Sequence, residues 1–157
     1  RAGVTESESH AVSGEREAFT ELVLRTFRLN GELLQVADKL AKPAGLTAAW
    51  WKVLGAVLRQ PLTVSGVARE MGLTRQSVQR IADLLVREGF ADYRPNPDHA
   101  RAKLLTPTPQ GWQAIDALRP GIAALARTLR DIVGDEDLRQ AIQVMDRITA
   151  ALVDLDE

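Results

Sequence analysis

The stretch from Thr63 to Gly89 constrains the fold more than any other part of the sequence, because two short amphipathic segments meet there at a glycine. The first segment predicts a helix over 64–71. Gly72 can adopt the positive φ that ends a helix, and the hydroxyl of Thr74 can cap the start of a second helix. The apolar positions that form the two helical stripes are Val67, Ala68 and Met71, then Val78, Ile81 and Leu85. This order of elements predicts a helix-turn-helix.

The first two turns of the second helix carry a polar face whose side chains can hydrogen bond with base edges or phosphates. They are Arg75, Gln76, Ser77, Gln79 and Arg80. In a helix-turn-helix the second helix enters the major groove, and we expect the start of the first helix, at Thr63 and Ser65, to contact phosphate. The alternative is that two short helices around a glycine turn are ordinary parts of an all-α domain.

The residues after Gly89 favour the first interpretation, because their alternation predicts a β-hairpin. We expect strands over 90–94 and 100–106, joined by the proline-rich turn 95–98 and ended by Pro107, which cannot donate to a strand ladder. A helix-turn-helix followed directly by a hairpin is a winged helix. The wing carries Arg94, Arg101 and Lys103, which suit phosphate or minor-groove contact. The alternative is a solvated hairpin whose basic residues only aid solubility.

Three further segments predict long amphipathic helices, at 15–41, 108–133 and 136–155. Pro120 is expected to kink the second of these helices without ending it. A winged helix over 46–107 is too small to cover three apolar faces. The simplest arrangement interleaves them with the same helices of a second copy in a two-fold dimer. Such a homodimer would bind a pseudo-palindromic operator in double-stranded DNA, with half-sites about 10 base pairs apart.

Together these elements predict a mainly α fold with a small β-wing: a winged helix-turn-helix with dimerisation helices from both termini. Residues 1–14 are polar, lack apolar periodicity and are expected to form a flexible tail. We expect a single domain over 15–155, in which 15–41 and 108–155 are the dimerisation helices and 46–107 is the DNA-binding region.

The distribution of charge supports this interpretation, although the net charge of the whole chain is only −1. Residues 52–103 hold 9 basic and 5 acidic side chains, whereas residues 104–157 hold 5 basic and 9 acidic ones. Positive charge therefore gathers on the helix-turn-helix and the wing. Local positive charge is what neutralises phosphates.

Several functional classes are excluded or disfavoured by the residues the sequence lacks. It has no cysteine, which excludes disulfides, thiolate metal ligands, cysteine nucleophiles and peroxide sensing through thiols. It shows no paired histidine and carboxylate, no phosphate-binding glycine loop and no metal-ligand spacing. We therefore expect no enzyme activity, no metal site and no cofactor. No apolar run approaches the roughly 18 residues of a membrane span and no signal peptide is recognisable, so we expect a soluble, cytoplasmic protein with no membrane partner.

The order of several short motifs up to Gly111 resembles the multiple-antibiotic-resistance-regulator (MarR) family of bacterial winged-helix repressors. The motifs are Leu46-Thr47, Trp51-Lys52-Val53-Leu54, Leu73-Thr74-Arg75-Gln76-Ser77-Val78-Gln79-Arg80, Leu85-Val86-Arg87-Glu88-Gly89 and Thr108-Pro109-Gln110-Gly111. With the flanking helices, the resemblance covers Glu15 to Leu155. It implies a dimeric, sequence-specific transcriptional regulator, most often a repressor.

The resemblance also implies release from DNA by a small, often aromatic or phenolic, effector that binds between the dimerisation helices and the winged domain. By analogy the effector pocket would lie near Phe19, Val23, Trp51 and Trp112, and the alternative is that these residues are ordinary core packing. Trp50 and Trp51 are adjacent and cannot both point inward in the same way. One of them is therefore expected to line a cavity or lie partly exposed, unless both serve as plain core and interface packing.

The sequence departs from the family at the wing, where the usual pattern is Asp-x-Arg and the Asp steadies the Arg. Here the triplet is His99-Ala100-Arg101, with Asp98 next to it. The competing function is a winged helix that binds another protein without specific DNA binding. Such a surface would be expected to show exposed aromatic residues rather than the basic and amide side chains of 75–80.

Overall fold

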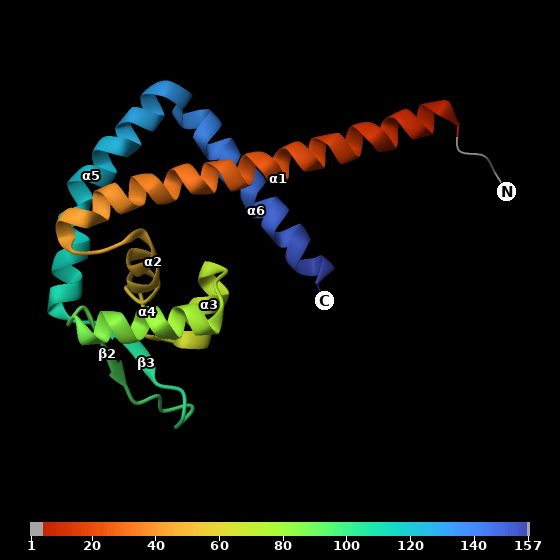
Figure 1. The fold of residues 1–157 in the computed structure, drawn as a ribbon. Helices are drawn as coiled ribbons and strands as arrows, with labels where there is room; N and C mark the ends of the chain where they lie inside the picture. Colours follow the sequence, from red (N-terminus) through yellow and green to blue (C-terminus); the bar gives the residue numbers. More distant parts are fainter. Residues whose placement is uncertain (1–4, 157) are drawn as a thin grey trace. The chain divides into compact units, whose positions relative to one another are not determined.

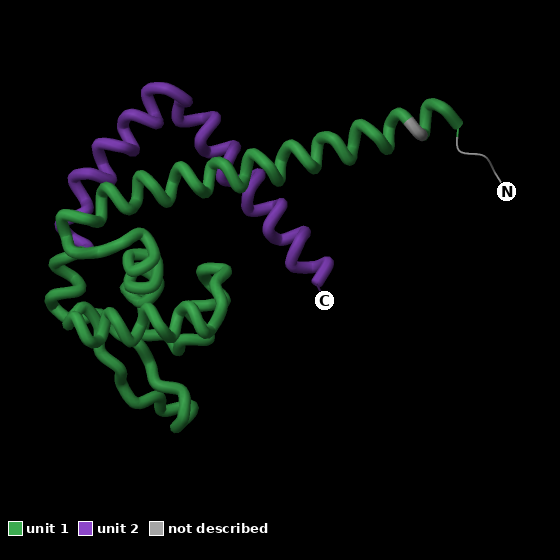
Figure 2. The backbone as a smooth tube through the Cα atoms, in the orientation of Figure 1, with its two compact units in different colours: residues 1–114 green, residues 115–157 purple. Residues whose placement is uncertain are grey.

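The computed structural model describes residues 5–156, apart from the side chain of Ser9. The chain divides into two compact units at the boundary between Ala114 and Ile115 (Figure 2). The elements in chain order are α1 (Glu6–Ala41), the short 3-10 helix η1 (Lys42–Ala44), α2 (Ala48–Ala56), β1 (Leu62–Thr63), α3 (Val64–Met71), α4 (Arg75–Arg87), β2 (Ala91–Arg94), β3 (Leu104–Pro107), α5 (Pro109–Val133) and α6 (Asp135–Leu155). The predicted mainly α fold with a small β-wing is confirmed.

Helix α1 begins at Glu6, well before the predicted start at residue 15, so the prediction of a flexible tail over 1–14 is wrong for residues 6–14. The physical cause is a capping box: the amide of Glu8 donates to Thr5 Oγ1 at 3.4 Å, and the amide of Thr5 donates to Glu8 Oε2 at 2.8 Å. The backbone hydrogen bond, followed by the Thr5 hydroxyl, holds the pKa of the Glu8 carboxyl below its ordinary value. The remaining part of the predicted tail, residues 1–4, lies outside the described residues.

The helix-turn-helix has the predicted bounds. Gly72 adopts the left-handed conformation, with φ of 63°, and the amides of Gly72 and Leu73 both donate to the carbonyl of Ala68 as α3 ends. The hydroxyl of Thr74 accepts from the amide of Ser77 at 3.1 Å and caps α4. The apolar stripes face one core, in which the largest fully buried side chains are Val53, Leu54, Val57, Val67, Val78, Leu85 and Leu105. Figure 1 shows α2, α3 and α4 gathered above the strands of the wing.

The sheet has three antiparallel strands in the order β1-β3-β2, and its first strand was not predicted. The two residues of β1 pair with Leu104 and Leu105, so β3 is the central strand. The second wing strand was predicted over 100–106 but begins only at residue 104. The residues before it form local turns instead of a strand. The amides of His99 and Ala102 each donate to the carbonyl three residues earlier in the chain. As predicted, Pro107 is the last residue of its strand.

The start of α5 is fastened to the turn that follows α4, all within residues 1–114. Thr108 Oγ1 donates to the carbonyl of Gly89 at 2.6 Å and accepts from the amide of Gly111 at 3.1 Å. The amide of Thr108 donates to the carbonyl of Phe90 at 3.0 Å. The Thr-Pro-x-Gly motif therefore anchors α5 to the turn that follows α4. As expected, α5 continues through Pro120 instead of ending there.

Helix α1 is attached to α2 near its C-terminal end, where Ala41 is buried and Asp38 Oδ1 accepts from the amide of Ala48 at 2.6 Å. Farther towards its N-terminus α1 leaves large apolar side chains in solvent; Phe27, for example, is 69% exposed. The second unit does the same at Ile132 and Ile142, which are 76% and 60% exposed. Within residues 5–156, no helix combines the length and apolar character that a membrane span requires.

Candidate nucleic-acid interface

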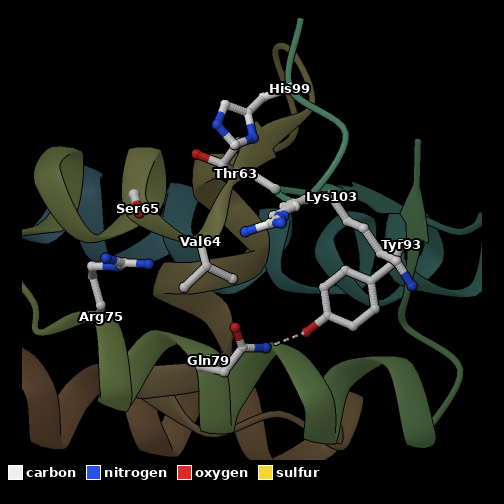
Figure 3. Close-up of a pocket in the computed structure, with 10 residues that line it drawn as sticks. Thr63, Val64, Ser65, Arg75, Gln79, Tyr93, His99 and Lys103 are labelled. Carbon is white, nitrogen blue, oxygen red and sulfur yellow. Dashed lines mark hydrogen bonds between the residues drawn. The ribbon is translucent and has the colours of Figure 1, made fainter. Parts of the chain in front are cut away.

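A hollow of about 430 Å³ lies between the start of α3, the first turns of α4 and the wing. Its lining brings together six of the ten predicted DNA-contacting residues: Thr63, Ser65, Arg75, Gln79, Arg101 and Lys103. Val64, Tyr93, His99 and Ala102 complete the lining. Figure 3 shows the side chains of Ser65, Arg75, Gln79 and Lys103 around this one space. Three separate stretches of sequence thus converge on one concave surface.

The hollow is basic and its cations are available for a ligand. Among residues 5–156, no ion pair involves Arg75, Arg101 or Lys103, although five other arginines form surface pairs. Thr63 Oγ1 accepts from the amide of Gly66 at 3.0 Å, which leaves its own hydroxyl hydrogen free to donate. Unpaired cations and free donors at a helix start are what a phosphate backbone binds.

A second hollow of about 610 Å³ continues along the exposed face of α4. Gln76 and Arg80 line it together with Arg75 and Gln79, so the predicted polar face forms a continuous surface with the first hollow. Ser77 is half-buried and lines neither hollow. Arg94 is exposed at the end of β2 and also lines neither one. Arg101 and Lys103 lie on the loop before β3 rather than on the predicted strand.

Tyr93 is a site residue that the sequence analysis did not single out. Its hydroxyl donates to Asp83 Oδ1 at 2.6 Å, and Gln79 Nε2 donates to both Asp83 Oδ1 and Tyr93 Oη at 3.0 Å. Burial, followed by the hydrogen bond to Asp83 and its negative charge, raises the pKa of the Tyr93 phenol well above its ordinary value. The signal available in the sequence was strand alternation, which places Tyr93 on the opposite face from Asp92 and Arg94.

The wing lacks the carboxylate support that the family pattern provides for its arginine. Asp98 does not replace it, because no ion pair joins Asp98 to Arg101 within the described part of the chain. The amide of Asp98 instead donates to Asn96 Oδ1 at 3.0 Å, which helps to form the turn of the wing. His99 lines the hollow beside Arg101.

Trp50 and Trp51 have different roles, in line with the expectation that one of them would line a cavity. Trp50 packs edge-on against Phe90, with ring centroids 6.3 Å apart. Trp51 lines a separate pocket of about 400 Å³, and the complete lining is Asn30, Leu33, Leu34, Ala37, Ala48, Trp51, Lys52, Gly55 and Met71. The other predicted effector residues do not line it: Phe19 and Trp112 are 58% and 41% exposed, and Val23 is half-buried elsewhere on α1.

Comparison with known proteins places the winged helix in a family. A model of the MarR family matches residues 44–102. The uncharacterized protein Rv2011c of Mycobacterium tuberculosis is 35% identical over 136 residues, which cover 87% of this chain and 95% of that protein.

Solved structures agree with this assignment. The MarR family transcriptional regulator Sco5413 of Streptomyces coelicolor has a TM-score of 0.74 and 25% identity, over 89% of this chain and 99% of that one. CouR of Rhodococcus jostii RHA1, solved bound to p-coumaroyl-CoA, has a TM-score of 0.72 and 23% identity, over 81% of this chain and 90% of that one. The chain belongs to the MarR family of transcriptional regulators.

Proposed function

We propose that this protein is a homodimeric repressor that binds a pseudo-palindromic operator in double-stranded DNA and leaves it when a small aromatic effector binds. The observation that carries the proposal is the basic hollow between α3, α4 and the wing, where predicted contact residues from three stretches of sequence converge. Within the described residues, Arg75, Arg101 and Lys103 form no ion pair. The phosphates of a DNA duplex can form ion pairs with these side chains. The protein acts by binding and carries out no chemical step.

The ten predicted contact residues form three groups. Gln76, Ser77, Gln79 and Arg80 face the major groove, and Arg75 reaches a base or a phosphate. Thr63 and Ser65 bind phosphate at the start of α3, while the wing contributes Arg94, Arg101 and Lys103. The hollow and its continuation along α4 support most of these roles, whereas Ser77 and Arg94 are supported only by their place in the sequence motif.

The proposed dimer is supported by large apolar side chains that are exposed in the described part of the chain. Phe27 and Leu24 on α1 are 69% and 61% exposed, and Leu155 on α6 is 80% exposed. Apolar surface of this extent on long helices typically marks an interface. A two-fold dimer would bury it, join residues 15–41 and 108–155 to the winged helix as one domain, and present two copies of α4 to successive major grooves.

The proposed effector site is the pocket between α1, α2 and α3 that Trp51 lines. Its volume of about 400 Å³ suits a small ligand, with leucines and Trp51 for an aromatic ring and Lys52 for an acidic group. The ligand of CouR, p-coumaroyl-CoA, supports an aromatic class. An effector acts through a difference in its affinity for the DNA-binding and the non-binding arrangements of the protein. This pocket lies between α1 and the winged helix, so a ligand there could favour one arrangement of these elements over the other.

Fluorescence anisotropy tests the DNA-binding function directly. The duplex upstream of the gene for this protein and a scrambled duplex are titrated at two salt concentrations. We expect tighter binding to the upstream duplex and an affinity that falls steeply as salt rises. Equal binding of both duplexes would refute specific recognition of this DNA, and no binding at low salt would favour the protein-interaction alternative.

The effector step has its own test on the same complex. Salicylate and p-coumarate are added to the protein–DNA complex, and loss of anisotropy reports release. Trp51→Ala should abolish the response to an active compound while DNA binding without the compound persists. An unchanged response would remove this pocket from the proposal.

A further inference from the structure

The cluster of Gln79, Asp83 and Tyr93 restricts what the recognition helix can present to a base. Gln79 and Asp83 are one helical turn apart on α4, and Tyr93 reaches them from β2. Gln79 Nε2 lies 3.0 Å from both Asp83 Oδ1 and Tyr93 Oη, and Tyr93 Oη lies 2.6 Å from Asp83 Oδ1. Figure 3 shows the Gln79 and Tyr93 side chains meeting at the edge of the hollow.

The chemistry of the cluster fixes which end of the Gln79 amide faces it. A carboxylate only accepts hydrogen bonds, and the single phenol hydrogen of Tyr93 is donated to Asp83, so Tyr93 Oη is left as an acceptor towards Gln79. The atom of Gln79 that contacts these two acceptors must be a donor, because an amide oxygen there would face two oxygens with no hydrogen between them, so it is the amide nitrogen. Burial and Asp83 raise the pKa of Tyr93 and keep the phenol hydrogen in place at neutral pH.

The oxygen of Gln79 is thereby left as the group that faces the DNA-binding surface. Gln79 lines both hollows, and among the described residues its Oε1 accepts no hydrogen bond. Figure 3 shows this oxygen directed away from Tyr93 and into the hollow, towards the side of Val64. With its amide nitrogen held by Asp83 and Tyr93, Gln79 presents its oxygen, a hydrogen-bond acceptor, to a base.

An acceptor alone distinguishes between bases in the major groove. The exocyclic amines of adenine and cytosine donate there, whereas guanine presents two acceptors and thymine presents an acceptor and a methyl group. A glutamine with a free amide would instead bind adenine through two hydrogen bonds, one from the base amine and one to N7. The two modes differ in whether N7 of adenine contributes.

We propose, on the basis of the DNA-binding function above, that Asp83 and Tyr93 hold Gln79 as a hydrogen-bond acceptor that selects adenine or cytosine at one position of each half-site. Gln79 determines specificity at that position. Asp83 and Tyr93 are positioning residues, because they act on the base only through the orientation of the Gln79 amide. By holding the amide nitrogen on the side of the cluster, they also disfavour its donation to guanine.

Selection from a random-sequence duplex library, followed by anisotropy on the selected duplex, locates the position. Gln79→Ala should erase base preference at one position of each half-site and leave the other positions unchanged. The matched control is Gln76→Ala, which removes an exposed glutamine outside the cluster and should change a different position. If Gln79→Ala changes no position, or if the position it changes prefers guanine or thymine, the proposal is wrong.

Base analogues then separate the acceptor mode from the two-bond mode. If the position is adenine, purine, which lacks the amine but keeps N7, should weaken binding about threefold to tenfold, as expected for one hydrogen bond. The 7-deazaadenine analogue, which keeps the amine but lacks N7, should bind as tightly as adenine. If the position is cytosine, 2-pyrimidinone, which lacks the amine, should weaken binding by the same factor. An equal loss with 7-deazaadenine, or no loss on removal of the amine, would overturn the proposal.

The positioning role is tested by freeing the amide. In the double variant Asp83→Ala with Tyr93→Phe, Gln79 regains its donors, so preference at the position should broaden and 7-deazaadenine should become weaker than adenine. A merely structural role would lower affinity on every duplex without altering this preference, and that outcome would refute positioning. If no duplex is enriched from the library by the unaltered protein, the DNA-binding function itself fails, and that failure is distinguishable from every outcome above.

Discussion

Gly111 lies where the start of α5 crosses the turn after α4, and an added methyl group has no room there. A Cβ at this position would lie 2.1 Å from the carbonyl oxygen of Phe90 and 3.2 Å from its carbonyl carbon. Both atoms belong to backbone, and that same carbonyl accepts from the amide of Thr108 at 3.0 Å. The clash can be relieved only by moving α5 away from the turn.

Two opposing effects decide the outcome of Gly111→Ala. Alanine is favoured over glycine inside a helix by about 1 kcal/mol. Overpacking a fixed site costs about 1–3 kcal/mol and occasionally more, and the upper end applies because the obstacle is a backbone carbonyl. We therefore expect the free energy of unfolding to fall by about 2 kcal/mol. For a chain of this size, that loss corresponds to a Tm lower by about 4–8 °C.

Thermal and urea unfolding followed by circular dichroism measure this difference, with all variants at one protomer concentration because association would shift the Tm. The matched control is Gly14→Ala in α1, where an added Cβ meets nothing within 4 Å. The same chemical change should leave stability there unchanged or slightly raised. If the two variants are equally stable, the close approach at Gly111 does not exist in solution and the anchoring of α5 is wrong.

Three further predictions concern DNA and the dimer. Arg80→Ala should weaken operator binding by about 1–3 kcal/mol and relax preference at one base pair, as measured by anisotropy; an equal loss on scrambled DNA would assign Arg80 to phosphate. Arg101→Ala should weaken binding to both duplexes and reduce the salt slope by about 1, and an unchanged slope would contradict a phosphate contact at the wing. Sedimentation at micromolar protein should give about twice the chain mass of 17.2 kDa, and Phe27→Asp should shift the species towards one chain; a stable monomer before substitution would refute the dimer.

The helix-turn-helix was predictable because its signals are local. Gly72 ends α3 by a conformation that its lack of a side chain permits, and Thr74 caps α4 with its own hydroxyl. The wing was only partly predictable, because strand bounds depend on pairing partners. Strand β3 begins where Leu104 and Leu105 pair with β1. Residues 100–103 themselves carry no sequence signal that predicts this start.

The start of α1 differs from the predicted start because the apolar periodicity that indicates a helix is weak before residue 15. Residues 6–14 carry few apolar side chains, and their helix continues from a capping box instead of from buried packing. The motif Thr5-x-x-Glu8 was present in the sequence and predicts a helix start. A polar helix end is therefore visible through its cap even where the apolar stripe is absent.

The Gln79 cluster shows why residue types on a recognition helix do not by themselves specify a base. From the sequence, Gln79 is a donor and an acceptor, and Asp83 is a visible neighbour because it follows by four residues on the same helix. Tyr93 is 14 residues away and reaches Gln79 only because β2 folds back against α4. Asp83 alone would hold the amide nitrogen from one side, and Tyr93 adds a second acceptor from the wing. In the proposal above, the base preference of α4 therefore depends on a wing residue that need not touch the DNA.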